Sequence, residues 1–342
     1  MNATIKHISY HLPEAILTND ALAELYPDWS ANRIYEKTGI RERRIAAEGE
    51  TAGDLAFHAA QRLFSESGTK PSDVDFVLLT TQSPDYFLPA TACILQNRLG
   101  ISASAGALDF NLGCSAYVYG LALAKGLIVG GMAKKVLFLA AETYSKHIHP
   151  MNKTVRTLFG DGATATLVEA SDGDDGIMDF TLGTDGAGHE MLMVHGGAMR
   201  IREESSNEQH DETTQPSTPK QRTHLTMNGP DIFTFTLDAV PGAVEKTLKK
   251  NAMVMDDVDL FVFHQANDFM LKALRKVMKI PHGKFYINME DVGNTVSASI
   301  PIAMARATAD GTLRAGMRVM LVGFGVGLSW GATVVKWKAG KN

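Results

Sequence analysis

Cys114 has the residue type and the position that thiol chemistry requires. It stands in the segment Asn-Leu-Gly-Cys-Ser-Ala, between an apolar run around Leu108 and a long stretch of small residues that we expect to be helical. A thiol at the start of a helix lies near free N–H groups and the positive end of the helix dipole, which lower its pKa and favour the nucleophilic thiolate. From the local sequence alone, a buried structural cysteine is an equally good interpretation, because free cysteine packs like a small hydrophobic residue.

His264 and Asn294 are the residues that could act together with such a thiol. His264 follows the apolar run 260–263, so it would leave a buried strand at its carboxyl end, where α/β sheets bind ligands. Asn294 follows Gly293, and by itself an asparagine there is interpreted as a cap or a turn residue. A Cys/His/Asn set also occurs in papain-like proteases, but their cysteine signature is absent here. An acyl group held on the cysteine, with His and Asn donating hydrogen bonds to a second thioester carbonyl, suits the sequence better.

Other motifs indicate structure or support for the thiol. The glycine-rich stretch 323–331 leads into another strand rather than a helix, so we do not interpret it as a dinucleotide site. Its backbone N–H groups suit an oxyanion hole. We interpret the turn 159–163 as structural and Cys93, which has apolar neighbours, as a core residue. His147 and His149 lack a third ligand at a suitable spacing, so no metal site is expected.

Short apolar runs that alternate with helical stretches must position these residues. Such runs are typical of strands covered on both faces, and therefore of an α/β sheet sandwiched by helices. The runs are 75–80, 136–141, 260–263 and 319–322, and the helical stretches include 51–66, 114–129 and 231–251.

Three segments of the first half recur in the second half in the same order. PSDVDFVLL from Pro71 matches MDDVDLFVF from Met255. ALDFNLGCSA resembles YINMEDVGNTVSA, and AKKVLFLAAE resembles AGMRVMLVGF. Matches at a near-constant offset predict a duplicated α/β unit with equivalent loops around a pseudo-twofold axis.

We expect the two halves to cover residues 1–175 and 176–342. Cys114 lies in the first half, His264 and Asn294 lie in the second, and all three follow strands in corresponding loops. The duplication therefore predicts that they converge. The segment 202–224 contains no hydrophobic residue, so we expect a surface insertion, either a tolerated addition or a lid or docking segment.

The composition excludes several classes of protein. The 342 residues are 45% hydrophobic and 21% charged, as in a soluble globular protein of about two domains. The net charge of -5 offers no basic surface to nucleic acid. We find neither an apolar run long enough to span a membrane nor a secretory signal. Two cysteines are too few for a disulfide framework, so we expect a cytoplasmic enzyme without nucleic-acid or membrane partners.

The ordered motifs resemble those of β-ketoacyl-acyl-carrier-protein synthase III, a condensing enzyme of the thiolase superfamily. NLGCSA, FGDGATA, HQAN, GNTVSASIP and GFGVGLSWG occur in that family's order over nearly the whole chain. The resemblance implies a thiolase-like fold with its two α/β halves in a layered αβαβα arrangement. Thiolases use a second cysteine late in the chain as a base, and Cys93 is misplaced for that role. Other synthases use two histidines, whereas this chain has Asn294 at the second position.

The resemblance also implies a decarboxylative Claisen condensation without a cofactor other than the substrates. Cys114 would take the acyl group of an acyl-CoA, and His264 and Asn294 would stabilise the carbanion formed when malonyl-acyl-carrier-protein loses CO₂. The backbone N–H groups of Cys114 and Val326 would form the oxyanion hole. Val326 occupies a position where the family usually has glycine.

Substrate-binding residues are implied in the same way. In relatives that use acetyl-CoA, a tryptophan and an arginine hold the adenine, and here the matching positions are Arg33 and Lys37, with Lys153 as a nearby basic contact. Trp29 could replace the missing aromatic ring. The acyl pocket of the family is closed by a residue of the partner subunit in a homodimer, which is Leu88 here instead of a bulkier phenylalanine.

The implied carrier-protein site is the helix that follows HQAN. The family's docking arginine is replaced by Phe269, but Lys272, Arg275 and Lys276 lie downstream and could contact an acidic carrier protein. A solvated helix face is an equally good interpretation of these cations.

The leading hypothesis is therefore a homodimeric enzyme that initiates fatty-acid synthesis. A specialised relative with a non-acetyl starter, serving a secondary metabolite or a surface lipid, is one alternative, favoured by Arg33, Lys37, Leu88 and Val326. A catalytically idle subunit that only binds acyl carrier protein is another, against which the intact Cys/His/Asn set argues.

Overall fold

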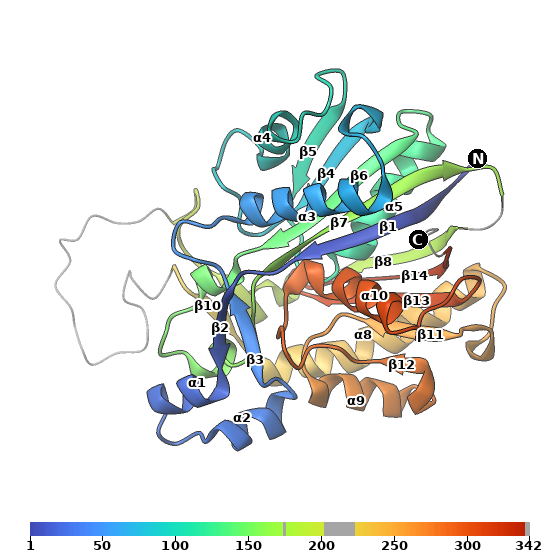
Figure 1. Cartoon of the computed structure of the whole chain (residues 1–342). Helices are drawn as coiled ribbons and strands as arrows, with labels where there is room; N and C mark the ends of the chain where they lie inside the picture. The colour runs from blue at the N-terminus through green and yellow to red at the C-terminus, as the bar shows by residue number, and fades with distance from the viewer. Residues whose placement is uncertain (174–175, 202–222, 339–342) are drawn as a thin grey trace.

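Two five-stranded sheets form the framework of the structure, a computed structural model that describes residues 1–173, 176–201 and 223–338 (Figure 1). The first sheet has the strand order β1-β7-β6-β4-β5, and the second has the order β12-β11-β13-β14-β8. The strands of the first sheet are β1 (Asn2–His11), β4 (Phe76–Thr80), β5 (Gly106–Phe110), β6 (Lys135–Glu142) and β7 (Gly162–Ser171). Those of the second are β8 (Ile177–Thr184), β11 (Leu260–Phe263), β12 (Phe285–Tyr286), β13 (Arg318–Gly325) and β14 (Ser329–Lys336).

Helices form three layers around these sheets. α3 (Ala52–Ser67) and α4 (Thr91–Arg98) pack on the first sheet, and α8 (Gly229–Lys250) packs on the second beside α9 (Asp268–Val277). α5 (Ala116–Val129) and α10 (Ser299–Ala309) contact strands of both sheets and so lie between them. The predicted αβαβα arrangement is confirmed.

Smaller elements complete the chain at the margins of the sheets. β2 pairs with β3, and β9 pairs with β10. These elements are β2 (Ala15–Thr18), α1 (Asn19–Leu25), α2 (Ala31–Thr38), β3 (Glu42–Ile45), α6 (Lys153–Arg156), β9 (Leu192–Val194) and β10 (Leu225–Met227). Short 3₁₀ turns are η1 (Pro71–Asp73), η2 (Tyr144–His147), η3 (Gly186–Met191), η4 (Met255–Asp257), η5 (His282–Lys284) and η6 (Val296–Ala298).

The strand orders show the duplication directly. Reversing the second order gives β8-β14-β13-β11-β12, which matches β1-β7-β6-β4-β5 strand for strand. The repeated Asp-Val-Asp motif performs the same task in each half. The Asp75 carboxylate accepts a hydrogen bond from the Lys135 N–H at 2.9 Å, and Asp259 accepts one from the Arg318 N–H at 2.8 Å. In both halves the aspartate therefore fastens the start of the neighbouring strand.

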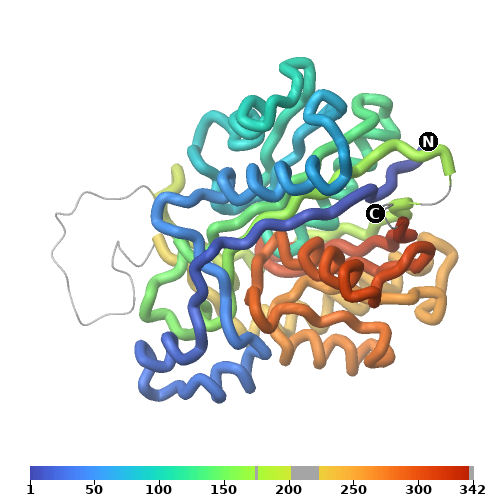
Figure 2. The backbone as a smooth tube through the Cα atoms, viewed as in Figure 1, coloured from blue at the N-terminus to red at the C-terminus, as the bar shows by residue number. Residues whose placement is uncertain are grey.

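The middle layer packs tightly because α5 consists of small and apolar residues. Gly120 lies against the ring of Phe138, so closely that a Cβ atom would come within 2.0 Å of it. Tyr117 of the same helix stacks on that ring with centroids 5.4 Å apart. Figure 2 shows the two ends of the described chain at the same side of the molecule.

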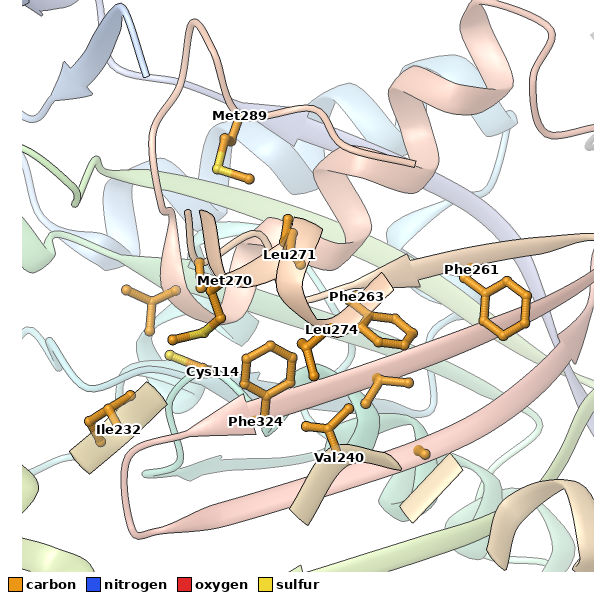
Figure 3. Packing of buried hydrophobic residues seen from close by; sticks show 14 of the residues in the cluster. Cys114, Ile232, Val240, Phe261, Phe263, Met270, Leu271, Leu274, Met289 and Phe324 are labelled. Carbon is orange, nitrogen blue, oxygen red and sulfur yellow. The ribbon is translucent and has the colours of Figure 1, made fainter. Parts of the chain in front are cut away.

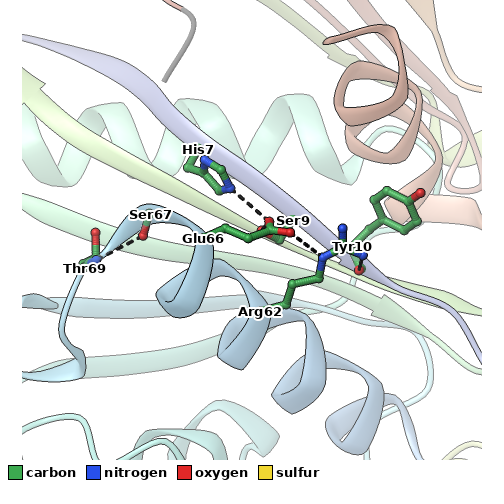
Figure 4. Close-up of polar contacts among 7 residues, drawn as sticks. All are labelled: His7, Ser9, Tyr10, Arg62, Glu66, Ser67 and Thr69. Carbon is green, nitrogen blue, oxygen red and sulfur yellow. Dashed lines mark hydrogen bonds and ion pairs between the residues drawn. The ribbon is translucent and has the colours of Figure 1, made fainter. Parts of the chain in front are cut away.

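A polar network fastens α3 to the edge strand β1 (Figure 4). Glu66 accepts hydrogen bonds from the Ser9 hydroxyl at 2.5 Å and from Arg62 Nε at 2.7 Å, and it lies 3.1 Å from His7 Nε2. Partial burial works in the opposite direction, but these hydrogen bonds lower the pKa of Glu66 to about 2.

Most predicted elements occur where the sequence indicated them. The four apolar runs form β4, β6, β11 and β13, and the three helical stretches form α3, α5 and α8. The placement of Cys93 in the core is wrong, because Cys93 is exposed on α4 while Ala92 and Leu95 are buried. The insertion predicted at 202–224 lies, except for its last two residues, outside the described residues. The division at residue 175 falls between β7 and β8 and stays a prediction.

Candidate active site

Cys114 lies where loops from both halves of the chain meet. It follows β5 and stands two residues before α5 begins at Ala116. Figure 3 shows it within a cluster of buried apolar side chains that includes Met270 and Phe324. The residue is only 5% exposed, so the thiol is nearly sealed from solvent in this form of the protein.

The glycine-rich end of β13 approaches the thiol closely. A Cβ atom at Gly325 would lie 2.8 Å from the Cβ of Cys114 and 3.0 Å from its sulfur, so only glycine fits there. The backbone N–H groups of Val326 and of Cys114 itself favour the thiolate and so act to lower the pKa of the thiol. These two N–H groups are the donors that the family resemblance implies for an oxyanion hole. The Val326 side chain packs against the backbone of Gly113, where a Cβ atom would lie only 2.5 Å from Val326 Cγ1.

The expectation of a lowered pKa for the Cys114 thiol is wrong. Burial, with a further contribution from the nearby carboxyl group of Glu142, raises the pKa of Cys114 to about 12. The two backbone N–H groups work in the opposite direction but do not compensate. Burial disfavours the charged thiolate by more than the backbone N–H groups at the start of α5 favour it. The Cys114 side chain therefore rests as a neutral thiol.

His264 leaves the end of β11 and is 2% exposed. Its Nδ1 atom is 2.7 Å from the Ser299 hydroxyl, at the start of α10. The ring packs edge-on against Phe324, with centroids 5.6 Å apart. Burial lowers the pKa of His264 to about 3, so the imidazole is neutral at physiological pH and presents one N–H donor.

Asn294 is held in a tight turn by its own side chain. Its Oδ1 atom accepts a hydrogen bond from the Val296 N–H at 2.9 Å, and its backbone N–H donates to the Leu158 carbonyl at 2.9 Å. Gly293 supports the turn with a φ of 72°. The residue is 4% exposed. Because Oδ1 is occupied, the Nδ2 donor is the polar atom of this side chain that can serve a ligand.

Glu142 is a member of this region that the sequence analysis missed. It ends β6 and is fully buried. It accepts hydrogen bonds from the Gln82 N–H and the Ser297 hydroxyl, both at 2.9 Å. Burial raises the pKa of Glu142 to about 8, with Asp161 adding to the effect. An acidic residue at the end of the apolar run VLFLAAE is the signal that could have revealed it.

The turn 159–163 is structural, as interpreted from the sequence. Asp161 is fully buried and accepts hydrogen bonds from the Ala46 N–H at 2.8 Å and from the Ser145 hydroxyl at 2.5 Å. The Gly160 N–H donates to the Asn294 carbonyl at 3.0 Å. The turn therefore supports Asn294 from behind.

The three cations expected to bind a nucleotide surround one aromatic ring. Arg33, Lys37 and Lys153 lie over Trp29 at 5.8, 5.4 and 5.6 Å from the ring centroid. Lys153 also forms an ion pair with Asp28. Residues from two separate parts of the chain thus form a half-exposed aromatic platform with positive charge around it.

The other expected binding residues lie on the surface. Leu88 is 80% exposed and does not contribute to the apolar cluster around Cys114 of its own chain. Lys272 and Lys276 are exposed on α9, and Lys272 pairs with Asp268 at 2.5 Å. Arg275 is partly buried and donates to the Ile280 carbonyl at 3.3 Å, so it caps the end of its own helix.

The described part of the chain offers neither a metal-binding cluster nor a membrane-spanning helix. No group of three or more His, Cys, Asp or Glu side chains in ranges 1–173, 176–201 and 223–338 is arranged to hold a metal ion. In the same ranges no helix has both the length and the apolarity needed to cross a membrane.

Two family profiles match the chain. Residues 108–186 match 3-oxoacyl-[acyl-carrier-protein] synthase III, and residues 248–337 match the C-terminal part of the same family. A protein named beta-ketoacyl-[acyl-carrier-protein] synthase III from Caldanaerobacter subterraneus subsp. tengcongensis is 37% identical over 328 residues, which are 96% of this chain and 95% of that protein.

Solved structures give the same result. A crystal structure of a 3-oxoacyl-(acyl-carrier-protein) synthase III is 52% identical, with a TM-score of 0.93 over 98% of this chain and 100% of that one. The corresponding enzyme from Pseudomonas aeruginosa PAO1 is 32% identical, with a TM-score of 0.87 over 99% of each chain.

Proposed function

This chain belongs to the 3-oxoacyl-[acyl-carrier-protein] synthase III family of condensing acyltransferases, and from that premise we propose how its own residues join an acyl-CoA starter to malonyl-acyl-carrier-protein. The assignment of roles is supported by the burial of Cys114, His264 and Asn294 and by a shared set of neighbours. Phe324, which contacts the His264 ring, and Val296, whose N–H binds Asn294, belong to the same apolar cluster as Cys114. The relatives named synthase III favour initiation of fatty-acid synthesis over the specialised alternative.

Acylation is the first half-reaction. Cys114 Sγ attacks the thioester carbonyl of the acyl-CoA, and its proton leaves with the departing CoA thiol. The negative charge that develops on the carbonyl oxygen is stabilised by the N–H groups of Cys114 and Val326, which also favour the thiolate of Cys114. Because the resting thiol is neutral, deprotonation accompanies attack instead of preceding it.

Decarboxylation of the malonyl group supplies the second nucleophile. Nδ2 of Asn294 and the ring N–H of His264 donate to the malonyl thioester oxygen. When the Ser299 hydroxyl donates to Nδ1, the ring proton lies on Nε2 and is available to the substrate. The C–C bond to the carboxylate breaks, CO₂ leaves, and the electron pair forms an enolate that two neutral donors stabilise.

The enolate carbon then attacks the acyl-cysteine. The new C–C bond gives the β-ketoacyl-carrier protein, and the Cys114 sulfur leaves as thiolate and takes up one proton. Carbon dioxide leaves as a neutral molecule, so the negative charge of the malonyl carboxylate passes through the enolate to the Cys114 thiolate and is cancelled by that proton. The reaction therefore balances without a redox or metal cofactor.

Substrate binding follows from the surface features of the chain. Trp29 stacks on the adenine of CoA, while Arg33, Lys37 and Lys153 neutralise its phosphates. Lys272 and Lys276 contact the acidic carrier protein. Arg275 contributes less to this contact with the carrier protein, because its guanidinium group already caps the end of α9.

The working unit in this proposal is a homodimer. β5 is the edge strand of the first sheet, and Tyr86, Phe87 and Leu88 nearby are 62%, 76% and 80% exposed. Pairing of two β5 edges would protect their free backbone groups and carry Leu88 into the acyl pocket of the partner. The proposed compartment is the cytoplasm, where the two free thiols of the chain remain reduced.

The variant Asn294→Ala tests the division of roles. We expect it to acylate Cys114 at the wild-type rate but to release CO₂ from malonyl-carrier protein about 10²-fold more slowly, because one of two donors is lost. Intact-protein mass spectrometry measures the first step and labelled CO₂ release measures the second. Asn97→Ala, at an exposed position on α4, is the control. Normal condensation by Asn294→Ala would show that the roles are assigned wrongly.

A panel of acyl-CoAs distinguishes the starter. A Cys114-dependent acetyl adduct supports initiation of fatty-acid synthesis, and preference for longer or aromatic acyl groups supports the specialised relative. Failure of Cys114 to react with any thioester revives the idle subunit.

A further inference from the structure

Glu142 is a fully buried carboxyl group that the reaction as proposed does not use. Burying such a group is costly unless hydrogen bonds compensate, so its partners show what it does. Those partners belong to two loops that are far apart in the sequence. The Gln82 N–H follows β4, and the Ser297 hydroxyl lies in η6 of the other half of the chain.

The hydrogen bond from Ser297 connects Glu142 to the turn that holds both donors of the decarboxylation step. On one side of Ser297, the Val296 N–H binds Asn294 Oδ1 at 2.9 Å. On the other side, the Ser299 hydroxyl is 2.7 Å from His264 Nδ1. One hydrogen bond of 2.9 Å from Ser297 to Glu142 therefore anchors the middle of the segment from which both donors are oriented.

The hydrogen bond from the Gln82 N–H connects Glu142 to the loop that carries Cys114. The Gln82 side chain donates to Asn111 Oδ1 at 3.2 Å. Its Oε1 atom lies against Gly113, where a Cβ atom would come within 2.5 Å. Since Gln82 N–H is bonded to Glu142 at 2.9 Å, the carboxyl group links the loop of Cys114 to the turn of Asn294.

We propose that Glu142 is a positioning residue for condensation: its carboxyl group fixes the Asn294 and His264 donors relative to Cys114 by bridging the loop after β4 and the turn 294–299. This inference rests on the proposed function. A displacement of about 1 Å at a reacting centre can slow a reaction about 10²-fold, so loss of this one bridge should slow decarboxylation measurably.

The test separates the two half-reactions in four variants. Ser297→Ala removes the hydrogen bond from Ser297 and leaves the carboxyl group in place. Glu142→Ala removes the hydrogen bonds from both Gln82 and Ser297. Glu142→Gln can keep both, because its amide can accept from the Gln82 N–H and donate to the Ser297 hydroxyl. Ser83→Ala is the matched control, since its hydroxyl is 3.5 Å from the same carboxyl group but lies outside the turn.

We expect Ser297→Ala and Glu142→Ala to release CO₂ from malonyl-carrier protein about 10- to 100-fold more slowly, with acylation of Cys114 within about threefold of wild type. Glu142→Gln and Ser83→Ala should decarboxylate at nearly the wild-type rate. Decarboxylation by Ser297→Ala within about threefold of wild type overturns the proposal, even where Glu142→Ala fails to fold. A wild-type enzyme that acylates Cys114 but releases no CO₂ refutes the proposed function instead.

A pH profile provides a readout that a merely structural role would not move. The groups that face Glu142 are Cys114, Tyr144 and Asp161, with His147 reached through Ser83. When Glu142 ionises above pH 8 its charge opposes formation of the Cys114 thiolate. Glu142→Gln lacks that charge, so its Cys114 should be alkylated by iodoacetamide roughly threefold to tenfold faster at pH 9. Equal rates in the two proteins would contradict the placement of Glu142 beside the thiol.

Discussion

Replacing Gly325 by alanine tests the geometry of the site at its tightest point. The added Cβ atom would lie 2.8 Å from the Cβ of Cys114 and 3.0 Å from its sulfur. Overpacking of this kind costs about 1–3 kcal/mol. The φ of 155° at this position adds about 1–3 kcal/mol for a residue other than glycine. We therefore expect Gly325→Ala to lose about 2–6 kcal/mol of unfolding free energy.

The same methyl group should block chemistry in the molecules that fold. It occupies space beside the sulfur where the acyl carbonyl must enter in the proposed reaction, next to the Val326 N–H of the proposed oxyanion hole. Loss of access to that donor should slow acylation by about 10²-fold or more. Urea unfolding measures the first effect, and mass spectrometry of the acetyl adduct measures the second.

Gly311→Ala is the matched control for the backbone term. Gly311 has a φ of 79°, but no atom other than those of its chain neighbours lies within 4 Å of its Cβ position. This variant should lose only about 1–2 kcal/mol and acylate normally. If Gly325→Ala were no less stable than Gly311→Ala and acylated Cys114 within about threefold of wild type, the reasoning about the thiol site would be refuted.

Three further outcomes are expected. Iodoacetamide at pH 8 should modify exposed Cys93 well before Cys114, because a pKa raised to about 12 leaves roughly one Cys114 thiol in ten thousand ionised. Peptide mapping measures the order of modification, and the reverse order would contradict the burial of Cys114. Trp29→Ala should raise the KM for acyl-CoA about 10-fold but leave that for acyl-pantetheine unchanged; equal effects on both would exclude adenine stacking. Leu108→Lys on the edge strand β5 should give monomers with weak acylation in size-exclusion and activity measurements, and an active dimer would remove β5 from the interface.

Local sequence patterns were sufficient for the framework. An apolar run such as 260–263 indicates a buried strand wherever it occurs, and β11 occupies those residues. The matched segments predicted the duplication because equivalent strands need equivalent side chains, as Asp75 and Asp259 illustrate. The sequence pattern gave the wrong burial for Cys93. In a helix of only eight residues, the burial of a single position depends on which face of the helix packs on the sheet, and the local sequence does not specify that face.

The sequence by itself determined the α/β duplication, the Cys/His/Asn set and the order of motifs that identifies the family, because these depend on neighbouring residues or on a repeat along the chain. Only the tertiary structure decided that the Cys114 thiol is neutral, that three cationic side chains lie over the Trp29 ring, and that Glu142 bridges two loops. Each of these depends on burial and on distances between residues far apart in the chain. Desolvation and hydrogen bonding act through space, and no periodicity along the sequence records them.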